Sequence, residues 1–321
     1  VLQLSKLYGF NIVKDYAVIF PGQGSQNASM LQEYLNNVEF SDTINEASEI
    51  LGYSIREIVQ DEKLNNTIYT QPVLLAVSNA IWNSWKSKIS RPPRVAAGHS
   101  LGEYSALVAA EALSLKDGLE LVSNRASLMV EHSKANPTTM AAVIGLEQNK
   151  IIEICKNISK SNSVIEAVNF NSSQQTVIGG HVDAIDRSIE IFKKEGAKIV
   201  KKLSVSLASH TSLLEKCSKE LNKCLKNITF KKPTFPIIHN FDASSQDQIS
   251  DIISSLSEQV CSPVRWTDSM TMISTMSINT FLEVGPGQVL TGLNKRINKS
   301  FTTYPLCGES EMYKALEGLE Q

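Results

Sequence analysis

The stretch Val95-Ala96-Ala97-Gly98-His99-Ser100-Leu101-Gly102 contains the most informative pattern of this sequence, a Gly-x-Ser-x-Gly motif. A short apolar run precedes the motif, and a helical pattern over residues 103–111 follows it. Strand, sharp turn and helix is the context in which such a motif presents a nucleophilic serine. The flanking glycines permit a strained turn, and the helix that begins there offers free backbone N–H groups. The pattern predicts that Ser100 attacks an acyl group whose developing negative charge those N–H groups stabilise.

The composition is that of an ordinary globular protein. The chain has 321 residues, of which 42% are apolar and 20% charged, and its net charge is −2. This balance gives no reason to expect nucleic-acid or membrane-surface binding, and the apolar runs are too short to span a bilayer. The five cysteines form no C-x-x-C pair, which argues against a structural zinc site and favours reduced thiols in a reducing compartment.

Strand and helix patterns alternate along most of the chain. The apolar runs predict strands at 16–20, 94–98, 235–239 and 279–283. The helical patterns lie at 26–36, 42–51, 71–88, 103–111, 114–134, 211–226, 247–260, 264–276 and 287–298. This alternation favours an α/β domain with a parallel sheet.

The middle of the chain has a different pattern. Residues 139–203 are predicted to contain strand, helix, two strands, helix and strand, the β-α-β-β-α-β order of a ferredoxin-like unit. We therefore expect a large α/β domain over 1–136 and 206–321, with a small subdomain inserted at 137–205. The first residue is Val1 rather than Met, so residues 1–14 are either the remnant of a targeting leader or an arbitrary boundary.

A serine nucleophile needs a base, and the chain offers five histidines. His210 is the best candidate because it lies on a loop where the chain returns to the large domain. His99 adjoins Ser100, and neighbours at such a turn usually point apart, whereas His132, His181 and His239 have only structural interpretations. No Asp or Glu near His210 stands out, so either a carboxylate remote in sequence or a backbone carbonyl orients it.

Two further features have both a structural and a functional interpretation. The segment Pro21-Gly22-Gln23-Gly24 is either a tight turn after the first strand or the source of a second oxyanion-hole N–H. Arg125 lies among apolar residues of a predicted helix, where an arginine usually extends its charge to solvent or forms an ion pair. The alternative is a fork for a substrate carboxylate.

Taken together, these motifs resemble one family, the malonyl-CoA:acyl carrier protein transacylases of bacterial-type fatty-acid synthesis. The matching landmarks occur in family order between about residues 16 and 298. They are Phe20-Pro-Gly-Gln-Gly-Ser-Gln26, Thr70-Gln71-Pro72, Gly98-His-Ser-Leu-Gly-Glu-Tyr104, Arg125, Met140-Ala-Ala, Val168-Asn-Phe-Asn171, Ser209-His210, Pro263-Val264-x-Trp266 and Glu283-Val-Gly-Pro-Gly287.

The resemblance implies a role for each matched residue. It implies an α/β-hydrolase-like large domain, in which Ser100 carries malonyl as an ester and His210 acts as general base and then general acid. It further implies that backbone N–H groups of Gln23 and Leu101 form the oxyanion hole, that Arg125 pairs with the malonyl carboxylate, and that the Gln259 main-chain carbonyl orients His210. Four more residues are implied to line the site: His99, Asn169, Asn171 and Asn240.

The resemblance also implies the reaction partners. The cycle is ping-pong, from malonyl-CoA to Ser100 and then to the phosphopantetheine thiol of acyl carrier protein, with no metal and no resident cofactor. A monomer is implied. The bacterial type of the family, the composition rich in Asn and Lys and the absence of a starting Met together favour a plastid-like organelle, with a bacterial cytoplasm as the alternative. Lys201-Lys202 and Lys231-Lys232 are candidate contacts for an acidic carrier protein, although paired lysines are usually plain solvated surface.

Three questions stay open at this level. A serine esterase or thioesterase could use the same Gly-x-Ser-x-Gly turn without needing Arg125, and a non-catalytic module could simply bind acyl carrier protein. The segment Val205 to His210 departs from common bacterial versions, which leaves the preference for malonyl over its substituted forms open. If His210 is the base, transfer should fall as the pH drops through the usual histidine range.

Overall fold

The computed structural model describes residues 14–134, 137–205 and 207–320, which form two separate β-sheets. The first sheet has five strands in the order β7-β2-β1-β8-β9, and every neighbouring pair is parallel. The strands are β1 (Ala17–Phe20), β2 (Val95–Gly98), β7 (Ile237–Ile238), β8 (Thr280–Glu283) and β9 (Thr302–Pro305). The predicted parallel sheet is confirmed. The strand β1 lies at the centre of this sheet, which explains why its residues are all apolar.

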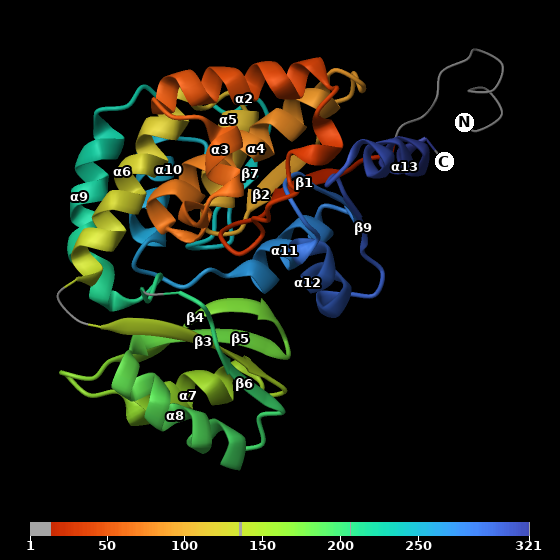
Figure 1. The fold of residues 1–321 in the computed structure, drawn as a ribbon. Helices are drawn as coiled ribbons and strands as arrows, with labels where there is room; N and C mark the ends of the chain where they lie inside the picture. The colour runs from red at the N-terminus through yellow and green to blue at the C-terminus, as the bar shows by residue number, and fades with distance from the viewer. Residues whose placement is uncertain (1–13, 135–136, 206, 321) are drawn as a thin grey trace.

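Helices cover both faces of this sheet (Figure 1). The side chains of β1 alternate between two hydrophobic cores, one on each face. Val18 and Phe20 belong to the larger core, and Ala17 and Ile19 to the smaller one. The larger core receives residues of α2 (Val38–Leu51), α3 (Ile55–Gln60), α4 (Thr67–Lys86), α5 (Gly102–Ala109), α6 (Leu115–Ser133), α9 (Glu215–Lys226), α10 (Ile249–Gln259) and α13 (Glu309–Leu319). The smaller core is closed by α11 (Trp266–Thr275) and α12 (Val289–Ile297).

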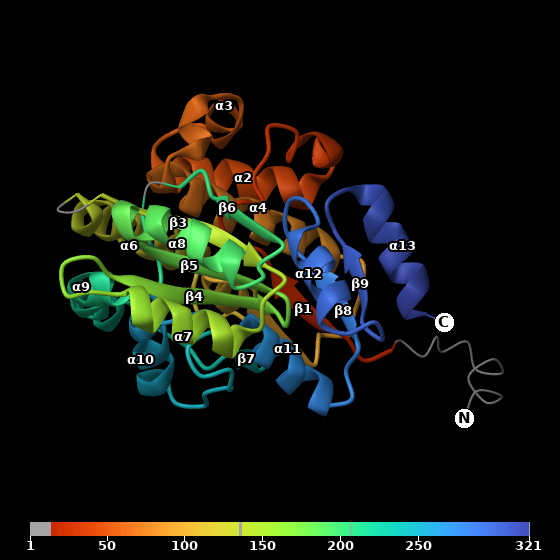
Figure 2. The same cartoon turned by 90° about the horizontal axis from the view of Figure 1, so that it is seen from below.

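The second sheet is antiparallel, with the strand order β4-β5-β3-β6. Its elements follow the predicted β-α-β-β-α-β order: β3 (Thr138–Ile144), α7 (Gln148–Ile158), β4 (Ile165–Ser172), β5 (Gln175–His181), α8 (Val182–Lys194) and β6 (Ile199–Lys202). The helices α7 and α8 cover one face of the sheet (Figure 2). The other face carries a small apolar cluster of Met140, Val168 and Val177 with Ala208.

The exact division of the chain into domains stays a prediction. Its boundaries at 137 and 205 adjoin residues 135–136 and 206, which lie outside the described residues. The segment 1–14, predicted as a leader remnant, also lies outside them apart from its last residue. Within the described part of the chain, no helix has both the length and the apolarity that crossing a bilayer requires.

Several predicted element boundaries are wrong for local reasons. The helix predicted at 26–36 is a series of turns with one short 3₁₀ helix, Gln32–Tyr34, because the Asn27 side chain accepts from the backbone and hydroxyl of Ser29 instead of permitting a helix. Asn37 caps α2 through the Phe40 N–H, so this helix starts four residues before the predicted 42. The elements α3, β9 and α13 were not predicted.

Other local signals are confirmed. Gly52 ends α2 with a φ of 72°, the left-handed conformation that favours glycine. Ser114 caps α6 and accepts a hydrogen bond from the Asp117 N–H, as the predicted capping box requires. These signals fix helix ends because they satisfy backbone groups that the helix itself leaves unpaired.

Candidate active site

Ser100 lies on the tight turn between the end of β2 and the start of α5, with a left-handed φ of 54°. The glycines on either side have a different role from the one predicted, since neither has a positive φ. A Cβ atom on Gly98 would lie 1.9 Å from the Gly102 carbonyl carbon, and one on Gly102 would lie 2.0 Å from the Phe20 oxygen. The glycines therefore permit close backbone packing, while the serine itself adopts the strained conformation.

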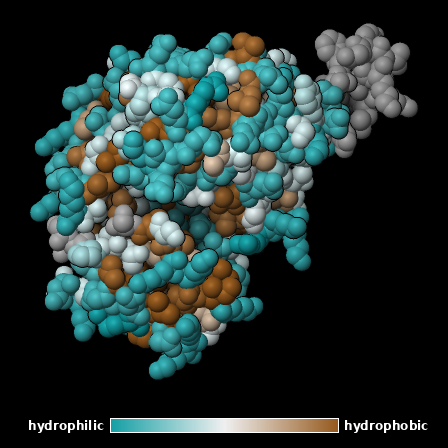
Figure 3. Space-filling model, in the orientation of Figure 1, coloured by the Kyte–Doolittle hydropathy of each residue, from teal (hydrophilic) through white to brown (hydrophobic). Residues whose placement is uncertain are grey.

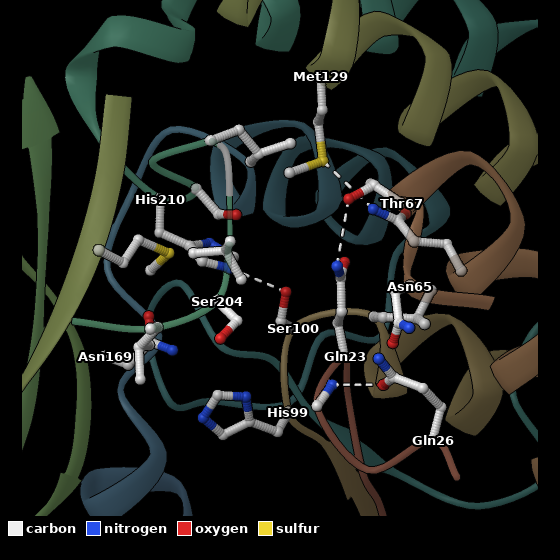
Figure 4. Close-up of a pocket in the computed structure, with 18 of the residues that line it drawn as sticks. Gln23, Gln26, Asn65, Thr67, His99, Ser100, Met129, Asn169, Ser204 and His210 are labelled. Atoms are coloured by element: carbon white, nitrogen blue, oxygen red, sulfur yellow. Dashed lines mark hydrogen bonds between the residues drawn. The ribbon is translucent and has the colours of Figure 1, made fainter. Parts of the chain in front are cut away.

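Ser100 and His210 lie within hydrogen-bond distance of each other (Figure 4). The Ser100 Oγ is 2.8 Å from His210 Nε2, and His210 Nδ1 is 2.7 Å from the main-chain oxygen of Gln259. Because a carbonyl only accepts, Nδ1 carries the proton and Nε2 is free to accept the serine hydroxyl. The orienting group is thus a backbone carbonyl, which resolves the alternative left open by the absence of a carboxylate in the sequence near His210.

The environment of His210 strongly favours its neutral form. Burial first, and then the positive charge of Arg125, lower the pKa of His210 to about 3. A neutral imidazole is the form that can take a proton from Ser100. This lowering of the pKa of His210 moves the expected loss of activity to a pH well below the usual histidine range.

Arg125 is buried rather than extended to solvent, with 1% of its surface exposed. Its Nη1 donates to Gln71 Oε1 at 2.7 Å, and its Nη2 lies 3.2 Å from both Ser100 Oγ and Gln259 Oε1. No carboxylate of the described residues forms an ion pair with it, and its Nε is buried without a hydrogen-bond partner. The usual interpretation, a snorkelling or ion-paired arginine, is wrong, and a buried cation among neutral groups favours an anion.

Two backbone N–H groups beside Ser100 are free to bind an oxyanion. Within the part of the chain that the structure describes, neither the Gln23 nor the Leu101 N–H donates a hydrogen bond, and both residues line the cavity at Ser100. They lie on loops that follow the adjacent strands β1 and β2. Gly22 permits the two loops to pack closely, because a Cβ atom at this position would lie only 2.4 Å from the His99 oxygen.

The residues predicted to line the site fall into two groups. Asn169 lies in the cavity wall, and its buried Oδ1 has no partner among the described residues. His99 lines the cavity too, but its ring points away from Ser100, with Nε2 2.8 Å from Asn171 Oδ1 (Figure 4). Asn171 and Asn240 lie behind the cavity. Asn240 holds the turn itself, because its Oδ1 accepts the Ser100 N–H and its Nδ2 donates to the Gly98 oxygen.

The other histidines have structural partners. His132 lies 3.2 Å from Glu220, and His181 accepts the Val164 N–H at the start of α8. His239 is buried against Glu103, with 2.7 Å between Nδ1 and Oε1. This pair was missed by the sequence reasoning, although Glu103 directly follows the serine motif. Gln71 was also missed as a partner of Arg125, although it belongs to the Thr-Gln-Pro landmark.

The cavity at Ser100 has a volume of about 620 Å³ and lies between the two sheets. The surface is hollowed at the same place in the space-filling view (Figure 3). Met140, Asn169 and the segment 203–205 form the wall on the antiparallel side, and Gln23, Thr67 and Gln71 lie opposite. Lys201 and Lys202 directly precede that wall, whereas Lys231 bonds the Ala112 oxygen beyond the far end of α5. No cluster of three metal-binding side chains occurs in the described ranges.

Comparisons with known proteins agree with this arrangement. A family model described as an acyl transferase domain matches residues 17–311. The chain is 41% identical over 290 residues to a malonyl CoA-acyl carrier protein transacylase of Haemophilus influenzae, covering 89% of this chain and 93% of that protein. It is 39% identical over 306 residues to the protein of the same name from Escherichia coli K12, covering 94% and 99%.

Solved structures give the same result. The malonyl CoA-acyl carrier protein transacylase of Coxiella burnetii superimposes with a TM-score of 0.94 at 36% identity, over 97% of this chain and all of that one. A malonyl-transacylase solved in complex with a type II polyketide synthase acyl-carrier protein superimposes with a TM-score of 0.92 at 38% identity, over 95% of this chain and 100% of that one.

Proposed function

We propose, from the premise that this chain belongs to the acyl transferase family and within it to the malonyl-CoA:acyl carrier protein transacylases, that Ser100 carries malonyl between the two thiol carriers. The enzyme takes malonyl from malonyl-CoA and delivers it to the phosphopantetheine thiol of acyl carrier protein. The fold, the family and the relatives support this activity, and the residue roles follow from the geometry of the site.

One observation carries the assignment of substrate. The Nη2 of the buried Arg125 lies 3.2 Å from the Ser100 oxygen, and no carboxylate of the described residues neutralises it. In a malonyl ester, a single methylene separates the carbonyl carbon on Ser100 from the free carboxylate. The guanidinium is therefore within hydrogen-bonding reach of that carboxylate, and its planar fork matches the two carboxylate oxygens. An acetyl group would leave the buried charge unpaired.

The acylation half-reaction follows from the hydrogen bonds of the dyad. His210 Nε2 takes the proton of Ser100 as its oxygen attacks the thioester carbonyl carbon. The carbonyl oxygen becomes an oxyanion, which the N–H groups of Gln23 and Leu101 stabilise. As the tetrahedral intermediate collapses, the carbon–sulfur bond breaks and His210 returns the proton to the leaving sulfur of coenzyme A.

Transfer to the second carrier reverses these steps. The thiol of acyl carrier protein enters after coenzyme A leaves, His210 takes its proton, and the sulfur attacks the ester carbonyl. The Ser100 oxygen leaves and recovers the proton from His210. The main-chain oxygen of Gln259 holds the imidazole in one tautomer throughout, because it accepts from Nδ1 at 2.7 Å.

A serine esterase or thioesterase with the same turn is the alternative. Such an enzyme must admit water to the acyl-enzyme and does not need a buried arginine beside its nucleophile. Arg125 therefore favours the transferase, because hydrolysis of neutral esters would gain nothing from the unpaired cation. A non-catalytic carrier-binding module would have no use for the Ser100–His210 hydrogen bond.

The partners and the cellular setting follow from the relatives. Acyl carrier protein is the macromolecular partner, as in the solved complex of a related transacylase. Malonyl-CoA is substrate rather than cofactor, and the chemistry above requires no resident cofactor or metal. The curated relatives are bacterial, which supports a bacterial cytoplasm over the plastid-like organelle.

Intact-protein mass spectrometry after brief exposure to malonyl-CoA tests the assignment. A malonyl adduct is expected on the wild-type protein, and none on Ser100→Ala or after exposure to acetyl-CoA. Steady release of coenzyme A without an adduct or transfer would indicate a hydrolase. An acetyl adduct formed as fast as the malonyl adduct would contradict the role of Arg125.

A further inference from the structure

Glu103 is a fully buried carboxylate next to the active site that does not line the cavity. It lies in the first turn of α5, three residues after Ser100. A carboxylate is costly to bury unless donors surround it. Three do: His239 Nδ1 lies 2.7 Å from Oε1, while the Asn240 N–H and Gln259 Nε2 lie 2.9 and 2.8 Å from Oε2.

Two of these donors also hold the peptide groups of Ser100. The Asn240 side chain accepts the Ser100 N–H at 2.6 Å, and Gln259 Nε2 donates to the Ser100 oxygen at 2.9 Å. The N–H and the carbonyl of Ser100 are therefore each fixed by a side chain of Asn240 or Gln259, and both of these residues donate to one oxygen of Glu103, Asn240 through its backbone N–H and Gln259 through Nε2. Such a backbone conformation persists only where its surroundings determine it strongly.

The amide of Gln259 can satisfy its neighbours in only one orientation. Its two N–H hydrogens face two acceptors, Glu103 Oε2 and the Ser100 oxygen, which leaves its Oε1 to accept from Arg125 Nη2 at 3.2 Å. A rotated amide would place an oxygen against two oxygens and an NH₂ group against a guanidinium. Glu103 thereby determines which end of this amide meets Arg125.

The main chain of the same glutamine orients the base. Its carbonyl oxygen accepts from His210 Nδ1, so one residue contacts the nucleophile, the base and the cation. The Glu103 side chain contacts none of these three groups directly, whereas its backbone N–H donates to the Ser100 oxygen at 3.1 Å. The carboxylate therefore acts on the reacting groups through Gln259 and Asn240.

We propose that Glu103 is a positioning residue of malonyl transfer, whose Oε2 acts as the shared acceptor that fixes Gln259 and Asn240 and, through them, Ser100 and Arg125. The part of this inference that concerns Arg125 and malonyl rests on the proposed function. Its effect on Ser100 is independent of the acyl group, because the hydrogen bonds to the Ser100 peptide groups involve no substrate.

The test compares three substitutions. Glu103→Met preserves the length of the side chain and removes the acceptor, whereas Glu103→Gln preserves one oxygen that can accept from both Asn240 and Gln259. Glu283→Met is the matched control, because Glu283 is equally buried but accepts from Leu290 and Thr291 at the start of α12. Two rates are measured: labelling of Ser100 by a neutral fluorophosphonate, and transfer of malonyl to acyl carrier protein.

We expect Glu103→Met to lower malonyl transfer about 10²-fold, the effect of a small misplacement at a reacting centre, and to lower labelling less. Glu103→Gln should remain within about tenfold of the wild type, since it retains the acceptor. In a Gln259→Ala background, Glu103→Met should lose most of its effect on malonyl transfer, because the residue through which it acts is gone. If Glu103→Met fails to fold, Glu103→Asp replaces it with the same expectation, since its carboxylate is one methylene short of Gln259.

Labelling and transfer rates of Glu103→Met that match those of the wild type would overturn the inference, as would an equal loss in Glu283→Met or additive losses in the Gln259→Ala background. Equal losses in Glu103→Gln and Glu103→Met would also overturn it, since they would show that charge rather than the acceptor matters. Failure of the proposed function is distinct: the wild-type protein would then form no malonyl ester, while labelling of Ser100 would still respond to Glu103.

Discussion

The guanidinium of Arg125 and the hydroxyl of Ser100 are joined directly, with 3.2 Å between Nη2 and Oγ. In the proposed function, the group that selects the substrate and the group that reacts thus contact each other before any substrate is bound. A substrate that brings its own carboxylate replaces a neutral partner of Arg125 with an anionic one. Selectivity and nucleophilicity are therefore coupled at a single hydrogen bond.

Arg125→Ala should cripple malonyl transfer and spare neutral esters. Losing one partner of a buried charge pair costs about 3–5 kcal/mol, which corresponds to a loss of roughly two to four orders of magnitude in kcat/KM for malonyl-CoA. Acylation by p-nitrophenyl acetate should change far less, because that ester has no carboxylate. Steady-state kinetics with both substrates measure the split, and equal losses for the two would show that Arg125 acts on Ser100 rather than on malonyl.

The acid limb of kcat/KM should lie well below pH 6. The folded-state pKa of His210 is lowered to about 3, chiefly by burial, so the base remains competent as the pH falls and is lost only when the pH approaches that value. Arg125 is the second cause of the lowering, so Arg125→Ala should move the limb to higher pH. Stopped-flow acylation with a neutral ester from pH 4 to 8 checks both. A midpoint near the ordinary histidine value of about 6.5 in the wild type would contradict this assignment.

Gln71→Glu should inhibit the enzyme by supplying an internal anion. Gln71 Oε1 already accepts from Arg125 Nη1 at 2.7 Å, so a glutamate there would pair with the guanidinium and compete with the malonyl carboxylate. We expect KM for malonyl-CoA to rise at least tenfold, which corresponds to a loss of about 1.4 kcal/mol of binding free energy. The thermal midpoint should not fall, because a buried cation gains a partner. Titration calorimetry with malonyl-CoA on Ser100→Ala and on the double variant checks the affinity directly.

Gly102→Ala should prevent correct folding, although it adds only a methyl group. The added Cβ atom would lie 2.0 Å from the Phe20 oxygen, a backbone atom that cannot move without displacing β1. Gly292→Ala is the control, because nothing lies within 4 Å of a Cβ at that position in α12. For Gly292→Ala we expect the free energy of unfolding to increase by about 0.5–1 kcal/mol, as for alanine in any open helical position. Denaturant unfolding of both variants measures the contrast, and a soluble, fully stable Gly102→Ala protein would show that the turn can relax.

Local and periodic signals in the sequence predicted the fold well where they were strong. The apolar run ending at Phe20 and the capping residues at Ser114 determine elements through contacts within a few residues, so a single sequence reveals them. The turn region at 26–36 was predicted wrongly because Asn27 and Ser29 bond the backbone locally in place of a helix. The strand β9 was missed because Thr302–Pro305 is partly exposed and, unlike the equally short β1 and β2, contains no buried apolar run.

The site was predictable only where a motif marks it. Ser100, His210 and Arg125 come together from the turn before α5, a loop and α6, and no spacing rule relates their positions along the chain. The motif and the family resemblance supplied what periodicity could not. The partners behind the site, Glu103 and His239, lie 136 residues apart and meet only because β2 and β7 are neighbours in the sheet. Contacts of that kind depend on tertiary packing, which is why the sequence around His239 did not predict its pairing with Glu103.

The position of the cavity between the two sheets divides its lining between the two parts of the protein. In the proposed function, every group that exchanges a proton or meets the carboxylate belongs to the parallel-sheet part, whereas the antiparallel sheet and the segment after β6 supply wall residues such as Met140, Asn169 and Val205. Hydrogen bonds join the two parts at several places among the described residues, including Glu166 to Ser212, Asn171 to His99, and the main chains of Val168 and Phe170 to Val264. Under the proposed function, substitutions in the wall should therefore change the preference for the acyl group or the carrier while leaving the catalytic groups in place, provided that these connections are retained.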